Sequence, residues 1–237
     1  MRATAPRAVT QICQALQDQI EHGLLSSGCK LPAERKLSEV FATTRITLRE
    51  ALLQLEARGL IYREERRGWY IAPPRLTYDL VKRSHFHAMV REQGREPSTQ
   101  LLSARLQPAP APVCESLGLA PLSSVIQLCR VRRIDARAVL YVEHYLDPQY
   151  FDGILLLDLS QPLTELYARH YGIEYGQVRF EVVPTALHAE AAAALKVSVG
   201  SPGLRITRVN FDQRGRLIDC DMEYWRHDAI RLSAWVG

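Results

Sequence analysis

Several patterns that would indicate a membrane protein, a disulfide-stabilised protein or a common enzyme class are missing from this sequence of 237 residues. No apolar run is long enough to span a membrane, and the N-terminus has no signal-peptide pattern, so we expect a cytoplasmic protein. The five cysteines are odd in number and never spaced as C-x-x-C, which predicts reduced thiols rather than disulfides or a zinc site. Neither a G-x-S-x-G, a P-loop nor an H-E-x-x-H motif occurs.

What is present is an ordinary globular composition with an uneven distribution of charge. Apolar residues make up 47% and charged residues 24% of the chain, and its length allows two domains of normal size. The net charge is +4, and residues 1–75 carry all of the excess, with 12 Lys and Arg against 8 Asp and Glu; the remainder has 18 of each. This distribution favours a polyanion partner for the first third, although so small an excess does not decide the matter alone.

The first third has the pattern of three helices followed by a hairpin. Apolar residues recur at helical spacing over 9–24, which predicts a first helix. Pro32 suits the first turn of a second helix, whose buried side would be formed by Leu37, Val40 and Phe41. Thr43 or Thr44 can cap a third helix that ends near Arg58. Residues 60–62 and 69–71 are β-prone and flank a charged turn at 64–68. Three helices and a hairpin in this order predict a winged helix-turn-helix.

The two prolines at 73 and 74 mark the expected domain boundary, because proline cannot continue a strand ladder. We therefore expect a DNA-binding domain over 1–72, a linker over 73–83 and a second domain over 84–237. The second domain has the pattern of an α+β fold with an antiparallel sheet, including a hairpin at 125–134 and 139–145. Its other expected elements are helices at 86–93, 163–171 and 189–195, strands at 99–106, 179–184, 204–211 and 217–225, and a stiff connector at 108–112.

A specific motif runs through the first domain. It consists of Leu31-Pro32-Ala33-Glu34-Arg35, then Thr44-Arg45-Ile46-Thr47-Leu48-Arg49, then Gly59-Leu60-Ile61. Over residues 12–72 the chain resembles the GntR family of bacterial transcriptional regulators. The resemblance implies a winged helix-turn-helix that binds double-stranded operator DNA.

The third helix gives this resemblance a chemical basis. Arg45 and Arg49 are four residues apart and share one side, and arginine presents a bidentate fork to the N7 and O6 atoms of guanine. The family pattern implies that Arg35 and Arg45 or Arg49 read base edges, while Thr44 and Thr47 bind phosphates. Taken alone, two arginines on a helix are usually a solvated face, and it is the order and spacing of the turn, the helix and the wing that favour DNA binding.

The hairpin tip is the second predicted DNA contact. The family places a glycine there against the minor groove, and Arg67 and Gly68 occupy that place here, with Arg66 also able to hold phosphate. The tip departs from the glycine-rich form of the family because Trp69 follows directly, which leaves the depth of insertion open.

Residues 84–237 resemble the UTRA ligand-binding domain of the HutC branch of that family. The matching segments are Gly94-x-x-Pro97-x-Thr99, Arg130-Val131-Arg132, Glu143-x-Tyr145, Tyr171-Gly172-Ile173 and Arg226-x-Asp228. The resemblance implies a chorismate-lyase-like α+β fold, a homodimer and a pocket for a small, often anionic metabolite.

Alternation along the strands predicts the pocket residues. Arg130 and Arg132 point the same way and could clamp a phosphate, phosphonate or carboxylate, unless a longer hairpin turns Arg133 inward instead. Carboxylates facing arginines suit a zwitterion, whereas the alternative is a set of surface ion pairs. The candidate effector-binding residues are Ser84, Arg130, Arg132, Glu143, Tyr145, Asp219 and Asp221.

Two hypotheses about the function follow from these resemblances. Residues 68–71, 85–97 and 141–145 resemble regulators of 2-aminoethylphosphonate use, a ligand with one anionic and one cationic end. A lyase-like fold also raises an enzyme hypothesis, but fold alone does not confer chemistry. His85 and His87 would diverge on a helix and do not indicate a metal site. We expect a repressor controlled by a small metabolite, without enzyme activity, metal or cofactor.

Overall fold

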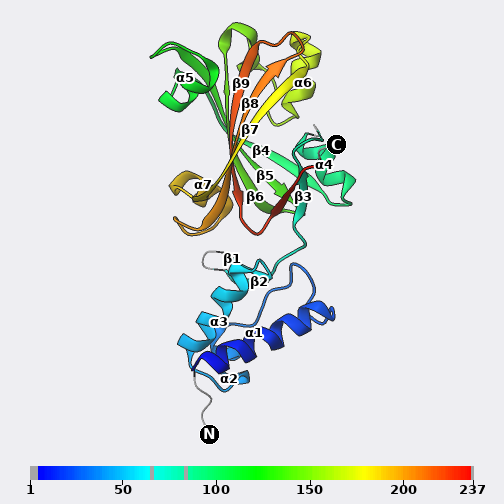
Figure 1. Cartoon of the computed structure of the whole chain (residues 1–237), viewed down its shortest axis with the longest axis vertical. Helices are drawn as coiled ribbons and strands as arrows, with labels where there is room; N and C mark the ends of the chain where they lie inside the picture. Colours follow the sequence, from blue (N-terminus) through cyan, green and yellow to red (C-terminus); the bar gives the residue numbers. More distant parts are fainter. Residues whose placement is uncertain (1–4, 65–66, 83–84, 236–237) are drawn as a thin grey trace. The chain divides into compact units, whose positions relative to one another are not determined.

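The computed structural model describes residues 5–64, 67–82 and 85–235. The chain divides into two compact units (Figure 1). The first contains residues 1–75 with the short segments 196–198 and 227–230, and the second contains the rest. Within the described residues, no helix has the length and apolar character needed to cross a membrane.

The first unit is the winged helix-turn-helix that the sequence predicted. Its elements are α1 (Ala5–Glu21), α2 (Glu34–Val40), α3 (Arg45–Ala57) and an antiparallel hairpin of β1 (Ile61–Glu64) and β2 (Gly68–Ile71). Pro32 does not lie in the first turn of α2 as expected, because the residue before that helix, Ala33, still has an extended backbone (φ −55°, ψ 145°).

The leucine stripe of α3 forms the centre of this unit. Leu48, Leu52 and Leu55 are fully buried and pack against the apolar side of α1. Leu37 joins this core, but Val40, expected on the buried side of α2, is 68% exposed. Because one face of α3 is held inside, its opposite face is fixed toward solvent.

The second unit is built on a six-stranded antiparallel sheet with the strand order β4-β5-β6-β9-β8-β7. The strands are β4 (Pro97–Pro108), β5 (Ser124–Ile134), β6 (Arg137–Leu146), β7 (Tyr175–Ala186), β8 (Pro202–Asp212) and β9 (Leu217–Arg226). The predicted hairpin is β5 and β6, joined through Asp135 and Ala136, which both have positive φ.

Helices cover the two faces of the sheet differently. On one face, α6 (Leu163–Tyr171) packs over Leu128 with the 3-10 helices Pro148–Tyr150 and Ile154–Leu156, and α4 (Phe86–Glu92) packs over Trp225. On the other face lie α5 (Ala111–Leu117) and α7 (Ala189–Leu195). The first of these faces carries the pocket described below.

Two elements were missed by the sequence reasoning. The expected stiff connector at 108–112 instead ends β4 and starts α5, since Pro112 occupies a first-turn position where no N–H is needed. Within the expected linker, residues 76–79 form β3 (Leu76–Asp79), which pairs with β10 (Ile230–Ser233). Unlike β1 and β2, which flank a short turn, these two strands lie far apart in the sequence, so no hairpin pattern indicates their pairing.

Candidate functional site

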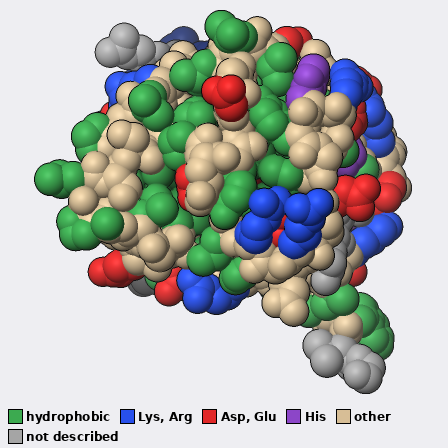
Figure 2. Space-filling view, turned by 90° about the horizontal axis from the view of Figure 1, so that it is seen from above, with side chains coloured by type: hydrophobic (Ala, Val, Ile, Leu, Met, Phe, Trp, Pro, Cys, Tyr) green, Lys and Arg blue, Asp and Glu red, His purple; other side chains and the backbone are tan. Residues whose placement is uncertain are grey.

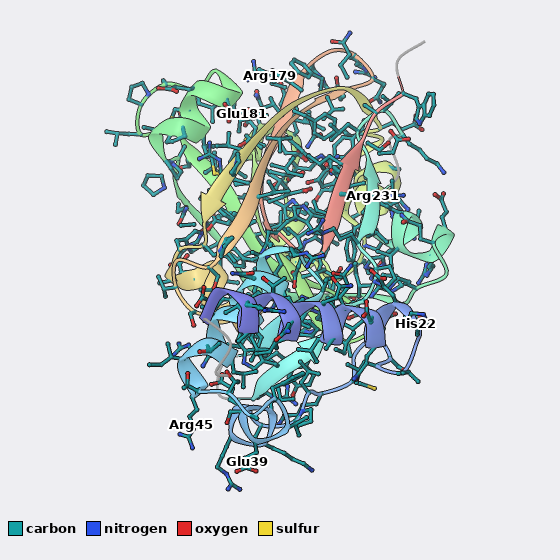
Figure 3. All side chains as sticks on the ribbon, turned by 60° about the horizontal axis from the view of Figure 1, so that its bottom comes forward. His22, Glu39, Arg45, Arg179, Glu181 and Arg231 are labelled. Carbon is teal, nitrogen blue, oxygen red and sulfur yellow. The ribbon has the colours of Figure 1, made fainter. Side chains whose placement is uncertain are left out.

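The exposed face of α3 displays the residues predicted to contact DNA. Thr44 is the N-cap, and its hydroxyl oxygen accepts a hydrogen bond from the Thr47 backbone N–H at 3.2 Å. Arg45 and Arg49 are exposed, and Figure 3 shows the side chain of Arg45 extending away from the helix. Ile46 between them is 83% exposed, a large apolar side chain that the sequence reasoning did not single out.

Ion pairing distinguishes the three predicted arginines. Arg35 donates to Glu39 at 3.3 Å, and both side chains are mostly exposed, so this pair is weak. In the part of the chain that the structure describes, neither Arg45 nor Arg49 has an ion-pair partner. Their guanidinium groups are therefore available to an external acceptor.

The wing has a buried tryptophan behind its tip. Trp69 is 3% exposed and its indole N–H donates to Glu34 at 2.9 Å, so this ring belongs to the core and does not project. Gly68 has φ +102°, a conformation that L side chains rarely adopt. Arg67 is exposed and pairs with Glu64 at 2.8 Å. The predicted phosphate contact Arg66 lies outside the described residues.

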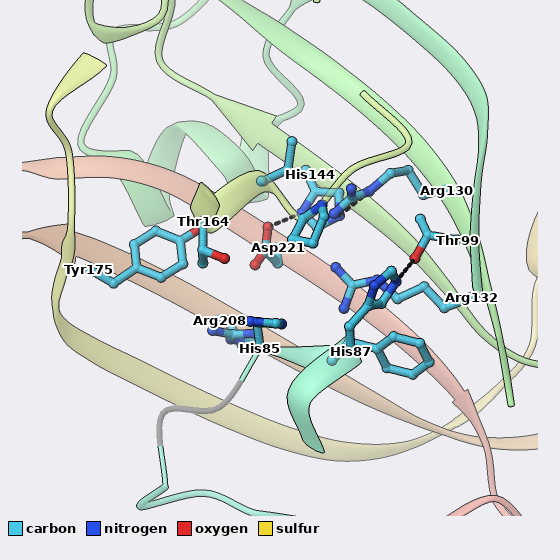
Figure 4. Close-up of a pocket in the computed structure, with 13 residues that line it drawn as sticks. His85, His87, Thr99, Arg130, Arg132, His144, Thr164, Tyr175, Arg208 and Asp221 are labelled. Carbon is cyan, nitrogen blue, oxygen red and sulfur yellow. Dashed lines mark hydrogen bonds and ion pairs between the residues drawn. The ribbon is translucent and has the colours of Figure 1, made fainter. Parts of the chain in front are cut away.

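A cavity of about 50 Å³ lies in the second unit between the sheet and the starts of α4 and α6 (Figure 4). Side chains from all six strands of the sheet and from both helices form its wall, and most of them are polar. The lining residues are His85, Phe86, His87, Thr99, Arg130, Arg132, His144, Pro162, Leu163, Thr164, Tyr175, Arg208 and Asp221. Of the predicted effector residues, this cavity brings together Arg130, Arg132 and Asp221.

Arg130 lines the cavity, but its hydrogen-bonding groups are already committed. Its Nε and Nη2 donate to His144 Nε2 at 3.1 and 2.9 Å, and its Nη1 donates to the carbonyls of Leu159 and Gln161 at 3.4 and 3.0 Å. The side chain is 1% exposed, and burial lowers the pKa of its guanidinium to about 9. Arg130 therefore anchors the loop before α6 to the sheet and is not a free anion ligand.

His144 is held neutral by its burial and by Arg130. Arginine can only donate, so His144 Nε2 must accept from Arg130, and the ring proton lies on Nδ1, which donates to Asp221 Oδ1 at 2.5 Å. Burial, assisted by Arg130, lowers the pKa of His144 to about 3 despite Asp221. The pKa of Asp221 stays below its ordinary value although burial opposes this, because His144 and Arg208 stabilise the carboxylate.

Asp219 lies beside this group on the same face of β9 but does not line the cavity. It accepts hydrogen bonds from Asn210 Nδ2 at 2.5 Å and from the Tyr175 hydroxyl at 2.8 Å. Burial and the neighbouring Asp221 raise the pKa of Asp219 to about 7. Two buried carboxyl groups thus lie side by side, and the pKa of one of them, Asp219, is close to neutral pH.

Three buried donors in the cavity wall have no hydrogen-bond partner among the described residues. They are Arg132 Nε, Arg208 Nε and the hydroxyl of Thr164. Arg132 lies over the Phe86 ring at 5.1 Å, and Arg208 donates to Glu223 at 3.4 Å. Buried polar groups are normally satisfied, so donors left open around a cavity indicate a site for an acceptor-rich group.

Other predicted residues lie elsewhere. Glu143 and Tyr145 are on the opposite face of β6 from His144, because side chains alternate along a strand, and the Tyr145 hydroxyl donates to Glu143 at 2.9 Å. The structure therefore does not bring them to the cavity, and the expectation that they face it is wrong in this respect. Arg133 donates to Gln100 at 2.9 Å, so Arg132 is the arginine that faces inward. Ser84 lies outside the described residues.

Seven polar cavity residues were not among the predicted effector residues, namely His85, His87, Thr99, His144, Thr164, Tyr175 and Arg208. Strand alternation could have identified Arg208, since it pairs with Asp221 across β8 and β9. Thr164 comes from the start of a helix, and no pattern in the chain predicts that this helix meets β5.

The two neighbouring histidines act separately. His85 Nδ1 accepts from the Ala88 backbone N–H at 3.3 Å, and His87 Nε2 contacts the Thr99 hydroxyl at 2.8 Å. Burial, with Arg132 nearby, lowers the pKa of His87 to about 4. Within the described residues, no group of three or more His, Cys, Asp or Glu has an arrangement suited to a metal ion.

On the face seen in Figure 2, acidic and basic side chains lie among hydrophobic and other side chains, and several Lys and Arg side chains form one group. Arg130, Arg132 and Arg208, by contrast, line the cavity, where the lower dielectric makes each interaction stronger.

Comparison with known proteins assigns both units. Residues 8–71 match the model described as bacterial regulatory proteins, gntR family, and residues 92–231 match the UTRA domain. The chain is 29% identical over 220 residues to the uncharacterized HTH-type transcriptional regulator YihL of Escherichia coli (92% of this chain, 93% of YihL). It is 26% identical over 218 residues to the HTH-type transcriptional repressor NagR of Bacillus subtilis (92% and 90%).

A solved structure extends the same comparison to the fold. The crystal structure of PhnF from Mycobacterium smegmatis has a TM-score of 0.66 and 25% sequence identity, and the match covers 95% of this chain and 99% of PhnF. YihL and NagR are named as transcriptional regulators, in agreement with the expectation of a regulator rather than an enzyme. The chain therefore belongs to the GntR family of bacterial regulatory proteins and carries a UTRA domain.

Proposed function

We propose that this regulator is a repressor that leaves its operator when a small anionic metabolite binds the cavity of the UTRA domain. The observation that carries the proposal is the set of open donors, Arg132 Nε, Arg208 Nε and Thr164 Oγ1, around a cavity of about 50 Å³. A phosphate or phosphonate group offers acceptors in several directions and would satisfy all three. Repression is favoured because the relative NagR is named a transcriptional repressor.

On the DNA side, we propose that Arg45 and Arg49 read base edges in the major groove. Thr44 and Thr47 bind phosphates near the start of α3, Arg35 supports them from α2, and the wing adds Arg67 and Gly68. Both guanidinium groups on α3 are exposed and without an ion-pair partner in the described residues, which is what a bidentate contact to guanine requires.

The regulator acts as a homodimer in the bacterial cytoplasm, with two winged helices on a pseudo-palindromic operator. Effector binding shifts the population toward a spacing of the two helices that fits the operator less well. A zwitterion such as 2-aminoethylphosphonate suits the cavity, since Asp221 lies beside the arginines and a carboxylate oxygen can accept a second donor.

The test uses operator gel shifts and thermal unfolding with inorganic phosphate, 2-aminoethylphosphonate, sugar phosphates and amino acids. We expect a phosphate- or phosphonate-bearing compound to raise the melting temperature and release DNA. Arg132→Ala should abolish this response, whereas Arg133→Ala, one residue away and bonded to Gln100, should keep it. An unaltered response in Arg132→Ala would refute the proposed anion site, and consumption of the compound over time would favour an enzyme instead.

A further inference from the structure

A second cavity lies next to the first on the same face of the sheet. Its volume is about 30 Å³, and its walls include Tyr175, Val178, Phe180, Arg208 and Asn210. Tyr175 and Arg208, drawn in Figure 4 in the wall of the first cavity, also line the second, so these two side chains form the boundary that the cavities share. A ligand that displaces the Tyr175 ring could therefore extend from one cavity into the other.

The second cavity is also lined by two cations, Arg208 and Lys82, of which Lys82 pairs with Glu92 at 2.7 Å, but it differs from the first cavity in holding an open buried acceptor. Asn210 is fully buried, and its amide nitrogen donates to Asp219 at 2.5 Å and to Asp221 at 3.2 Å. Because carboxylate oxygens accept, these two bonds fix the orientation of the amide. The Asn210 carbonyl oxygen is left as a buried acceptor with no partner among the described residues. A second acceptor, the Asp79 carboxylate, also lines this cavity.

Between the open donors of the first cavity and the open acceptor of the second, the wall is mainly aromatic and aliphatic. Phe180 and Val178 come from β7, and Val178 is the direct register partner of Asn210. The complementary ligand thus has an acceptor-rich anion at one end, a short apolar stretch, and a hydrogen-bond donor at the other end. Each cavity alone has room for little more than one such group.

We propose that the effector spans both cavities. Its anionic group lies between Arg132 and Thr164, and a hydroxyl or amino group at its far end donates to Asn210. Tyr175 and Arg208 flank the chain that joins the two ends. This inference rests on the proposed effector function and adds that Asn210 selects the far end of the molecule.

The experiment uses substitutions at Val178 that make the second cavity smaller or larger, since Val178 lines the second cavity and not the first. Val178→Ile adds one methylene to its wall, and Val178→Ala removes two carbons. The matched control is Val182→Ile, which lies on the same strand and face but pairs with Ile206 and lines neither cavity. The probes are inorganic phosphate, propylphosphonate and 3-aminopropylphosphonate, measured by titration calorimetry on the full chain.

We expect 3-aminopropylphosphonate to bind more tightly than propylphosphonate, because only the amine can satisfy Asn210. Val178→Ile should lower the affinity for 3-aminopropylphosphonate roughly tenfold, equivalent to about 1.4 kcal/mol. Phosphate binding should stay the same in both Val178 variants, and Val182→Ile should behave as the parent with every probe. Val178→Ala enlarges the same cavity and should not weaken the binding of 3-aminopropylphosphonate.

Two failures can be told apart. If phosphate binds and is lost in Arg132→Ala, but Val178→Ile and Val182→Ile have equal affinities for 3-aminopropylphosphonate, the effector does not use the second cavity. Equal affinities of the parent for propylphosphonate and its amino derivative would overturn the role of Asn210. If none of the probes binds, the anion site itself is refuted and the inference fails with it.

Discussion

The chain uses arginine in two contrasting environments. Arg45 and Arg49 on α3 are exposed, whereas Arg130, Arg132 and Arg208 belong to the cavity of the sheet, with Arg130 only 1% exposed. An exposed guanidinium is hydrated until DNA displaces the water, so its contribution depends on salt and arises on binding. A buried guanidinium has lost its water on folding and is held by fixed partners before any ligand arrives.

This contrast separates the roles of the buried arginines from one another. Arg130 has every donor group engaged with His144 or with backbone carbonyls, so its contribution is to the stability of the pocket. Arg132 and Arg208 each keep an unpartnered Nε, so their contribution includes binding. Burial alone therefore does not identify a ligand-binding arginine; the state of its hydrogen bonds does.

The largest effect is expected at Arg130. Arg130→Gln leaves His144 Nε2 and the carbonyls of Leu159 and Gln161 without their donor, and breaking a buried charged group away from its partners costs about 3–5 kcal/mol. Urea unfolding of the variant should show this loss. Arg133→Gln is the control and should cost less than about 1 kcal/mol, since it removes a single exposed hydrogen bond. Equal losses would mean that Arg130 is not the anchor of this loop.

At the exposed end of the comparison, Arg45→Ala should weaken specific operator binding by about 1–3 kcal/mol while leaving folding stability unchanged. The expected reason is the loss of a bidentate contact to a base. A gel shift against a mutated operator gives the specificity ratio, and Arg214→Ala, an exposed arginine of the second unit, controls for the loss of one positive charge. A uniform loss on all sequences would make Arg45 a phosphate contact instead.

The same contrast explains what the sequence could predict. The exposed arginines of α3 follow from helical periodicity, since Leu48, Leu52 and Leu55 fix the buried side and leave the other side to Arg45 and Arg49. The winged helix and the antiparallel sheet were predictable for the same reason, because both arise from local periodicity.

The pocket was only partly predictable because it depends on register and on elements distant in the chain. Alternation placed Arg130, Arg132 and Asp221 on a common face, but it gave no information on which side Glu143 lies relative to them. That relation follows from the register of β5 with β6, which places Leu128 and not Gln127 opposite His144. Thr164 reaches the cavity only through the packing of α6.

A smaller effect concerns the pair of buried carboxyl groups. The pKa of Asp219 is raised from 3.8 to about 7 by burial and by Asp221, so the folded state holds a proton that the unfolded state releases. The stability that Asp219 contributes is complete below about pH 4 and is lost as the pH rises through 7. Relative to Asp219→Asn, the parent should therefore lose about 2 kcal/mol between pH 5 and pH 7.

Denaturant unfolding of both proteins at several pH values measures this difference. His144 is present in both proteins, and because Asp219 and Asp221 interact, the difference reports the titration of the two carboxyl groups as a pair. Parallel stability curves would show that Asp219 is ionised in the folded protein and that the two carboxyl groups do not share a proton.

The smallest effect is expected at the start of α3. Thr44 caps the helix through a 3.2 Å bond to the Thr47 N–H, at an exposed position where water competes, so Thr44→Ala should cost only about 0.5 kcal/mol of folding stability. The same hydroxyl is proposed to bind phosphate, so operator affinity should fall on all sequences alike, while the salt dependence should stay the same because threonine carries no charge. Thr43→Ala, adjacent but not the cap, is the matched control. If Thr44→Ala lowers stability as expected but leaves DNA affinity equal to that of Thr43→Ala, the threonine only starts the helix, and the arginines that follow it carry the contact.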